Sequence, residues 1–431
     1  MRALNVPAVG EHERLSDLPV PTVTAGTVLV RVTAAGLNVV DNFVAVGMLG
    51  GQWPRAFPVV LGRDAAGVVA AVGPGVTRIR VGDEVVGTVP LAPPIQAGTL
   101  AEYALMPAEA VAVKPAGLDF VSAAALPFAG ALATAAVDAV RPRPGQTVLV
   151  NGASGGVGSY AIQLAAARGA EVVATGTPGD ADRLRRLGAA TVVDYTAAPV
   201  AEQVRAAYPD GVDALIDLVA YTARTLPLAA VATGGVVASG LGAADCEALA
   251  AAGLAGGNVR ANVTAALIAR LAEQAAAGTL AVEVTSVLPL DRATDGLRQL
   301  ATGEARGKIV VSIAGCPPRR RPGSRSRLGL CWAAGTTTLT LPEANRKNRA
   351  GDPVRRGGRL EVAPPRQEEV AAMSAVNCPM CELRFPSRNE RDWHLRNEHE
   401  HMHVHRPADR AEIWWRRSSR DVQQQERPPT G

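Results

Sequence analysis

A short apolar run followed by a glycine cluster marks the segment around which the rest of the chain can be placed. The run at residues 147–151 is typical of a buried parallel strand. Apolar residues then recur at helical spacing in 159–168, and 171–175 is a second strand. The turn after the first strand holds four glycines, Gly152, Gly155, Gly156 and Gly158. This order predicts a β-α-β unit with a glycine-rich first turn.

The glycine spacing, G-x-x-G-x-x-G, suits the binding of a nucleotide phosphate. Glycines let the backbone turn tightly and let a pyrophosphate approach the helix N-terminus, where N–H groups and the helix dipole favour anions. The alternative is a tight helix–strand contact without a ligand, but the strand, turn, helix and second strand have the lengths of a nucleotide-binding unit. A β-branched residue at either central glycine would then push bulk into the pyrophosphate site. The predicted contacts are Ser154, Gly155, Gly156 and Val157.

The same alternation extends along residues 119–287, with further strands expected at 191–194, 214–218 and 235–239. It predicts an α/β fold with a doubly wound parallel sheet that binds its ligand at the carboxyl ends of the strands.

Residues 1–118 have a different pattern, with strands at 27–33, 67–72 and 84–89 separated by glycine turns. A short helix is expected at 39–46. Strand character returns in 288–315, and this segment is expected to complete the first, β-rich domain.

The pattern changes again after Gly315. Residues 316–373 are rich in Pro and Arg and have no sustained period, which predicts a disordered linker. Residues 374–405 are rich in Cys and His, and 406–431 are expected to be a disordered tail. The spacing Cys-x2-Cys-x12-His-x4-His is typical of a small C2H2-type zinc finger. The predicted Zn²⁺ ligands are Cys378, Cys381, His394 and His399.

Charge and cysteine usage separate this tail from the rest of the chain. Residues 316–431 hold 22 Lys+Arg and 14 Asp+Glu, against 22 and 26 in residues 1–315. Residues 374–431 hold 10 Lys+Arg and 9 Asp+Glu. With such a small excess of positive charge, nucleic-acid binding is not expected of this segment. The first 245 residues lack Cys, which suits the reducing cytoplasm. Neither a signal sequence nor an apolar run long enough for a membrane span is expected.

Several stretches occur in the order found in one enzyme family, among them AAGLNVVDNFVAVG (34–47), LGRDAAGVVAAVGPGV (61–76), NGASGGVG (151–158) and RGKIVV (306–311). Over residues 1–315 the chain resembles the zinc-independent quinone oxidoreductases of the medium-chain dehydrogenase/reductase superfamily. The resemblance implies a GroES-like substrate domain, residues 1–118 completed by 288–315, and a Rossmann NADP-binding domain, residues 119–287. It also implies a homodimer.

The resemblance also bears on whether the chain binds zinc. Zinc-binding members of the superfamily carry a Cys and a G-H-E stretch in the first domain. Here that stretch is Gly62-Arg63-Asp64, and His12 is the only histidine before the tail. The expected activity is therefore metal-free hydride transfer to a small quinone or activated enone. Asn38 and Asp41 match the family's N-x-x-D beside the nicotinamide, and Asn38 could hydrogen-bond a carbonyl oxygen. The alternatives are a turn residue for Asn38 and a helix cap for Asp41.

Two other functions stay open. One is reduction of an enoyl thioester or enone, although no tyrosine follows Gly47, where enoyl-thioester reductases of the superfamily use one. Phe43 also stands where many relatives have tyrosine. The other is a regulatory, nucleic-acid-binding protein that uses its Rossmann body as a redox sensor.

The end of the second strand bears on the choice of cofactor. It is uncharged, with Thr175 and Thr177, whereas NAD binders place an acidic residue there, so NADPH is preferred over NADH. The resemblance adds Tyr195 as a contact to the 2′-phosphate. Asp180 stands where relatives often have Lys and would repel that phosphate, with Arg183 as compensation, so Asp180→Lys should favour NADPH. Two further positions resemble cofactor contacts, or are ordinary small core residues: Thr134 and Ser239.

Overall fold

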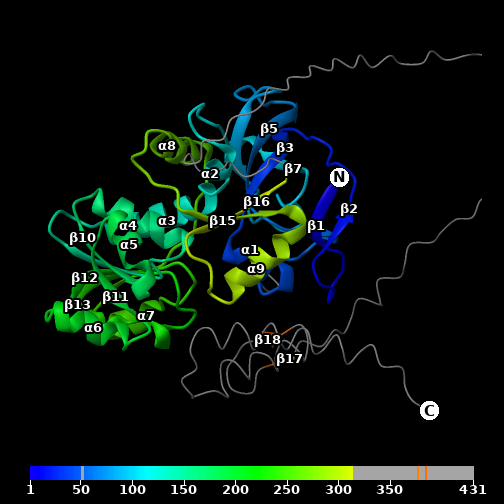
Figure 1. Cartoon of the computed structure of the whole chain (residues 1–431). Helices are drawn as coiled ribbons and strands as arrows, with labels where there is room; N and C mark the ends of the chain where they lie inside the picture. The colour runs from blue at the N-terminus through cyan, green and yellow to red at the C-terminus, as the bar shows by residue number, and fades with distance from the viewer. Residues whose placement is uncertain (50–52, 314–375, 378–383, 386–431) are drawn as a thin grey trace, which may run out of the picture. The chain divides into compact units, whose positions relative to one another are not determined.

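The computed structural model describes residues 1–49, 53–313, 376–377 and 384–385 of the 431-residue chain. The described residues up to 313 form one compact unit, and the other four residues belong to a second. Figure 1 shows a β-rich lobe and a lobe of alternating strands and helices in the first unit. The predicted α/β fold is confirmed.

The β-rich lobe contains two sheets. A seven-stranded sheet has the order β15-β16-β3-β5-β6-β8, with β7 also paired to β3. Its strands are β3 (Thr27–Gly36), β5 (Asp64–Val72), β6 (Glu84–Thr88), β7 (Tyr103–Pro107), β8 (Val111–Val113), β15 (Val284–Pro289) and β16 (Lys308–Ser312). A small sheet of order β2-β1-β4 consists of β1 (Arg2–Val6), β2 (Arg14–Asp17) and β4 (Val59–Val60).

The second lobe is built on a six-stranded parallel sheet of order β11-β10-β9-β12-β13-β14. Its strands are β9 (Thr147–Asn151), β10 (Glu171–Gly176), β11 (Ala189–Asp194), β12 (Val212–Asp217), β13 (Val231–Ser239) and β14 (Ala255–Asn258). The strand order reverses between β9 and β12, and ligands of such sheets bind at this switch point.

Helices connect these strands and cover the sheets. They are α1 (Val39–Val46), α2 (Phe120–Ala124), α3 (Pro127–Val140), α4 (Gly156–Ala166), α5 (Ala181–Arg186), α6 (Val200–Ala207), α7 (Cys246–Ala251), α8 (Ala265–Ala276) and α9 (Ala293–Ala301).

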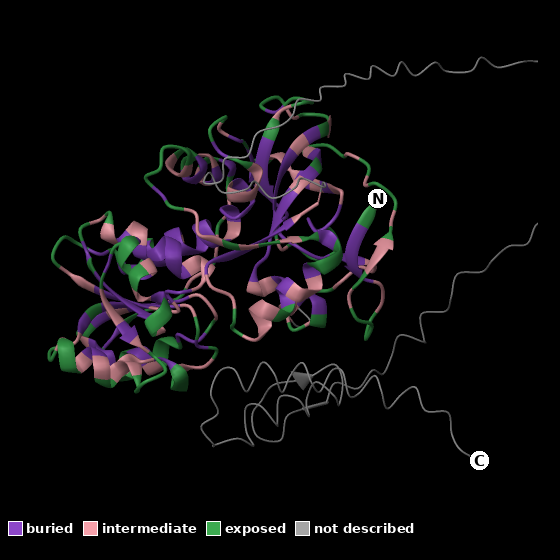
Figure 2. Cartoon of the chain, in the orientation of Figure 1, coloured by how far each residue is buried: buried purple, intermediate pink, exposed green. Residues whose placement is uncertain are grey.

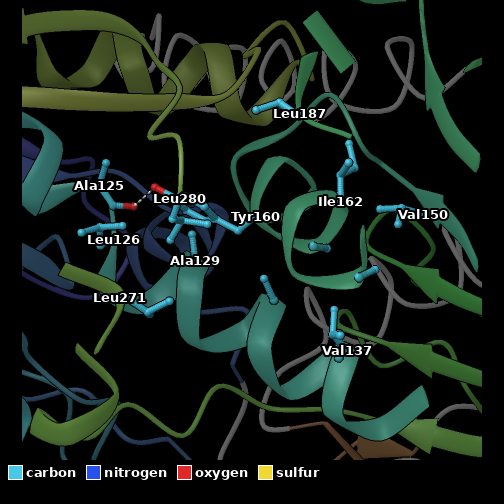
Figure 3. Close-up of a cluster of buried hydrophobic side chains, with 14 of the residues drawn as sticks. Ala125, Leu126, Ala129, Val137, Val150, Tyr160, Ile162, Leu187, Leu271 and Leu280 are labelled. Atoms are coloured by element: carbon cyan, nitrogen blue, oxygen red, sulfur yellow. Dashed lines mark hydrogen bonds between the residues drawn. The ribbon is translucent and has the colours of Figure 1, made fainter. Parts of the chain in front are cut away.

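Apolar packing holds the two lobes together. The buried residues of the strands, purple in Figure 2, include Val148 and Val150 of β9. They share one core cluster with Ala34 and Val86 of the seven-stranded sheet, and α2, α3 and α8 supply much of the rest. Figure 3 shows part of this cluster, where the Tyr160 hydroxyl donates to the Ala125 carbonyl over 3.2 Å. The core is therefore continuous between the lobes.

The chain returns from the parallel sheet to the seven-stranded sheet beside the glycine-rich turn. β15 starts at Val284, ahead of the predicted boundary at residue 288, and β16 pairs antiparallel with β3. Just before β16, the Gly307 N–H donates to the Ser154 carbonyl over 2.8 Å. This contact places the start of β16 against the turn expected to bind the cofactor.

In the second unit, β17 (Val376–Asn377) pairs antiparallel with β18 (Arg384–Phe385). The predicted linker 316–373, the tail 406–431 and the four predicted zinc ligands, Cys378, Cys381, His394 and His399, lie outside the described residues. Within the part of the chain that the structure describes, no helix is long and apolar enough to cross a membrane.

Candidate active site

The glycine-rich turn connects β9 to α4 at the switch point of the parallel sheet. Gly152 has φ +86°, a conformation that favours glycine. A Cβ atom on Gly158 would lie 2.3 Å from the Gly152 carbonyl oxygen, so only glycine lets the helix start this close to the turn. The N-terminus of α4 is thereby held beside the turn, as anion binding requires.

The two central glycines are not equivalent. A Cβ atom on Gly156 would lie 2.5 Å from Cδ of Lys308, whereas the nearest atom to one on Gly155 is the Gly152 oxygen at 3.4 Å. Bulk at Gly156 would therefore press on a buried lysine before it entered a phosphate site. A substitution at Gly156 is therefore expected to disturb Lys308 as well as the pyrophosphate site.

A row of polar side chains follows the carboxyl ends of four adjacent strands. The Thr175 hydroxyl accepts the Gly152 N–H over 2.9 Å and donates to Asn151 Oδ1 over 3.3 Å. Asn151 Nδ2 donates to Asp217 over 2.7 Å, and the Ser239 hydroxyl, beside Asp217 in the sheet register, accepts the Ala243 N–H. Thr175 and Ser239 thus hold the turn and the strand ends, and the Thr175 hydroxyl is not free for a 2′-phosphate.

Arg183 and Asp180 form the polar group at the end of β10. Arg183 Nη2 donates to Asp180 and to the Ser154 carbonyl, each over 3.0 Å. Asp180 also accepts the Thr177 N–H and hydroxyl and lies 3.3 Å from Arg306 Nε. Although burial alone would raise it, hydrogen bonds from Thr177 and Arg183 hold the pKa of Asp180 below its ordinary value.

In this pairing the charge of Asp180, which was expected to repel the phosphate, is offset by Arg183, the expected compensation, and by Arg306. Asp180 is 5% exposed and caps its own turn, with an arginine on each side. A lysine at this position would lose the cap and face two arginines, so Asp180→Lys should destabilise the fold rather than favour NADPH.

The residues at this edge fit a phosphorylated dinucleotide. The observation that supports this fit is at Arg183. Its Nη1 atom is buried without a hydrogen-bond partner among the described residues, whereas its Nη2 atom donates to Asp180 and Ser154. An unpaired buried guanidinium nitrogen is costly, and a phosphate oxygen would satisfy it. The glycine-rich turn contributes the second element of such a site.

The other predicted cofactor contacts are Val157, Tyr195 and Thr134. Val157, in the first turn of α4, packs against the hydrophobic core, and Tyr195 is 40% exposed just after β11. The Thr134 hydroxyl donates to the Gly130 carbonyl of its own helix. Thr134 lines a cavity of about 540 Å³ between α3 and residues 262–270, and no residue of the glycine-rich turn lines that cavity. Thr134 as a cofactor contact stays a prediction.

Asn38 is the N-cap residue of α1, where it shares a capping box with Asp41. Asn38 Nδ2 donates to Asp64 Oδ2 over 2.9 Å, and Asn38 Oδ1 accepts from Lys308 Nζ over 2.7 Å. Asp64 also accepts the Phe128 N–H with both oxygens, at 3.1 Å each. Burial raises the pKa of Asp64, an effect that the nearby Lys308 partly offsets. Asp64 thus connects the Asn38 amide to the start of α3 in the other lobe.

Asp41 is the N3 residue of α1 and the second member of its capping box. Its carboxylate accepts the Asn38 backbone N–H over 2.8 Å, and the side chain is completely buried. Arg63 Nε lies 3.8 Å from Asp41 Oδ1, beyond hydrogen-bond distance, and neither atom has another partner in the described part of the chain. Arg63 Nη2 instead donates to the Val60 and Ala97 carbonyls. Asp41 is thus buried against the backbone of Asn38 and is not open to solvent.

The titration of Asp41 gives a prediction for stability against pH. Burial raises the pKa of Asp41 from 3.8 to about 7, and Arg63 only partly offsets this. A carboxyl group with a raised folded-state pKa contributes stability that is complete below pH 3.8 and is lost as the pH rises to about 7. Asp41→Asn keeps an acceptor for the Asn38 N–H but does not titrate. Relative to this variant, the wild-type unfolding free energy should fall by about 1.4 kcal/mol per pH unit across that interval.

Urea unfolding of both proteins at a series of pH values measures this difference. The surface carboxylates titrate in both proteins, so their contributions cancel in the comparison. Parallel pH profiles for wild type and Asp41→Asn would show that Asp41 is ionised at all these pH values, and that Arg63 compensates for its burial.

Sequence patterns alone missed two members of this cluster, Asp64 and Lys308. Each is the only charged residue of its strand, β5 and β16, and each is at most 3% exposed. A lone charge in a buried strand needs a partner, which is the signal that could have identified them. Outside this cluster, Tyr221 follows β12 and packs edge-to-face on Phe43 of α1 at 6.1 Å between ring centroids.

Comparison with known protein families agrees with this division of the chain. The family described as alcohol dehydrogenase GroES-like domain matches residues 24–116, and the one described as zinc-binding dehydrogenase matches residues 187–311. A 2-methylene-furan-3-one reductase from Solanum lycopersicum is 32% identical over 303 residues, covering 69% of this chain and 74% of the relative.

Two further relatives show related chemistry in their names. A chloroplastic NADPH-dependent alkenal/one oxidoreductase from Arabidopsis thaliana is 31% identical, over 69% of this chain and 74% of the relative. The structure of the quinone oxidoreductase from Coxiella burnetii has a TM-score of 0.64 at 25% identity, covering 73% of this chain and 99% of that one. The fold, the glycine-rich turn and these similarities together show that the chain is an oxidoreductase of the medium-chain dehydrogenase/reductase superfamily.

Proposed function

We propose that the chain is a zinc-independent, NADPH-dependent reductase of conjugated carbonyl compounds, a class that includes quinones and activated enones. The observation that carries this proposal is the buried Asn38 amide, held between Asp64 and Lys308 beside the glycine-rich turn. When bound, NADPH supplies the hydride. Asn38 then donates a hydrogen bond to the carbonyl oxygen, where negative charge develops.

The cofactor side of the site rests on two groups. The glycine-rich turn and the N-terminus of α4 would hold the pyrophosphate. Arg183, with its unpaired Nη1, would hold the 2′-phosphate at the end of β10. The relative from Arabidopsis thaliana is NADPH-dependent by name, which supports the same choice.

Zinc independence rests on the donor atoms of residues 1–313, which include one cysteine, Cys246, and one histidine, His12. Zinc sites use cysteine and histidine ligands far more than any others. Arg63, whose charge opposes a cation, occupies the G-H-E stretch of zinc members and is buried there. The matching family is described as zinc-binding, but the residues at this place in the chain do not fit that metal.

A panel of acceptors tests the proposal. The purified protein, treated with a chelator, is given NADPH or NADH with quinones, alkenals, enones, enoyl thioesters and simple ketones, and nucleotide oxidation is followed by absorbance. Turnover of quinones or enones with NADPH preferred is the expected result. Activity only with simple ketones, and only after zinc is added, would overturn the proposal.

We also propose that the C-terminal segment binds one zinc ion through Cys378, Cys381, His394 and His399, on the strength of their spacing. A small segment of this kind takes its folding energy from the metal. Full-length protein should contain about one zinc per chain. A chain ending at residue 315 should contain none and keep its reductase activity. Metal analysis and kinetics of both forms measure this, and loss of activity on truncation would show that the two parts are not independent.

A further inference from the structure

The Asn38 amide lies between two buried groups of opposite charge. Its Oδ1 faces the Lys308 ammonium at 2.7 Å, and its Nδ2 faces the Asp64 carboxylate at 2.9 Å. All three residues are at most 6% exposed. An ammonium group can only donate and an ionised carboxylate can only accept, so a flipped amide would lose both hydrogen bonds and place like groups together. The two charges therefore determine which way the amide points.

The two charged groups are themselves held in place by the backbone. Lys308 Nζ also donates to the Leu37 carbonyl over 2.7 Å, and Asp64 accepts the Phe128 N–H. The stem of Lys308 passes next to Gly156, where an added Cβ would lie 2.5 Å from its Cδ. Lys308 thus extends from the glycine-rich turn to the amide, and its position is fixed at both ends.

One hydrogen of the Asn38 amide is left over. Nδ2 carries two hydrogens, and Asp64 accepts one of them. No acceptor within the described residues takes the other. We propose that Lys308 and Asp64 are positioning residues, which fix the Asn38 amide so that its second N–H points to the carbonyl oxygen of the acceptor.

This inference rests on the proposed reductase function and goes further, because it names what orients the donor. During hydride addition the electron pair moves onto the carbonyl oxygen, and a proton from water neutralises it later. A donor that is already oriented stabilises that charge without reorganisation, whereas a freely rotating amide presents its oxygen part of the time.

The test is a double-mutant cycle on the full-length protein. Lys308→Met keeps the length of the side chain and removes the ammonium group. It should lower kcat about tenfold, with the dissociation constant of NADPH, measured by fluorescence titration, unchanged. Asn38→Ala should lower kcat about 100-fold. Because the lysine acts through the amide, adding Lys308→Met to Asn38→Ala should cause no further loss.

Lys114→Met is the matched control. Lys114 is also buried, donates to the backbone carbonyls of Pro115 and Leu118, and pairs with Glu84 at 2.9 Å. Lys114 makes no contact with Asn38, so the kcat of the Lys114→Met variant should equal that of the wild type. The thermal midpoint of this variant measures how the loss of a buried ammonium group affects stability. Equal losses of kcat in Lys114→Met and Lys308→Met would overturn the inference.

A second readout does not depend on turnover. Selective ¹⁵N labelling of asparagine gives side-chain NH₂ signals, and the Asn38 pair is the one missing from Asn38→Ala. In Lys308→Met this pair should shift and broaden as the amide exchanges between two orientations, and an unchanged pair would contradict the inference. An active wild type with additive losses in the cycle overturns this inference only. A wild type inactive with every acceptor overturns the proposed function as well.

Discussion

Replacement of Asn38 by alanine is expected to lower kcat for quinone and enone acceptors by about 100-fold, which is the usual cost of losing one donor to a developing negative charge. The dissociation constant of NADPH should not change, because the groups expected to hold the nucleotide, the glycine-rich turn and Arg183, make no contact with the Asn38 side chain. Steady-state kinetics with saturating NADPH, together with a fluorescence titration of the nucleotide, separates the two effects.

Asn42→Ala is the control for this variant. Asn42 lies on the same helix, α1, and its amide donates to the Leu297 carbonyl of α9 over 3.0 Å. The substitution removes a similar side chain and a similar hydrogen bond, but away from Asp64 and Lys308. Its kcat should match that of the wild type. If Asn38→Ala turned over as fast as Asn42→Ala, Asn38 would have no role in catalysis.

Replacement of Arg183 by methionine is expected to lower the preference for NADPH over NADH roughly 10- to 100-fold, which corresponds to one charge-assisted contact. The reason is the unpaired Nη1 atom, which has no other use in the described part of the chain. The ratio of kcat/KM values for the two nucleotides measures this preference. The value for NADH should change little, since NADH has no 2′-phosphate.

The control is Arg185→Met on the same helix, α5. Arg185 pairs with Asp182 at 3.3 Å and is more than half exposed, so its removal should leave the ratio unchanged. If Arg183→Met also left the ratio unchanged, Arg183 would be a structural partner of Asp180 and Ser154 only, and another group would have to select the phosphate.

Much of the fold could be predicted from the sequence because its strands are strongly periodic. β9 was predicted at its observed bounds, and so was α1. β14 was missed because its residues, Ala255–Asn258, lack an apolar pattern. β14 is an edge strand, which pairs with a neighbouring strand on one side only. Its residue composition therefore does not reveal it.

The site was less predictable, because its contacts join residues far apart in the chain. Motif resemblance identified Asn38, but the partners that hold it are Asp64 and Lys308, and Lys308 lies 270 positions away. Thr175 shows the converse. Its place at the strand end pointed to the phosphate, whereas the hydroxyl is engaged by the turn. Which of two hydrogen bonds a side chain makes depends on packing that no local pattern records.

The most direct test of the proposed function is to determine which carbon atom of the acceptor receives the hydride. A conjugated enone is reduced by chelator-treated protein with NADPH that carries deuterium at both C4 positions, and the product is analysed by NMR and mass spectrometry. If the reduction needs no metal and the acceptor's carbonyl oxygen accepts a hydrogen bond, we expect a saturated ketone. It should carry one deuterium on the β carbon and a proton from water on the α carbon. An allylic alcohol with deuterium on the carbonyl carbon, formed only when zinc is restored, would contradict the proposed function.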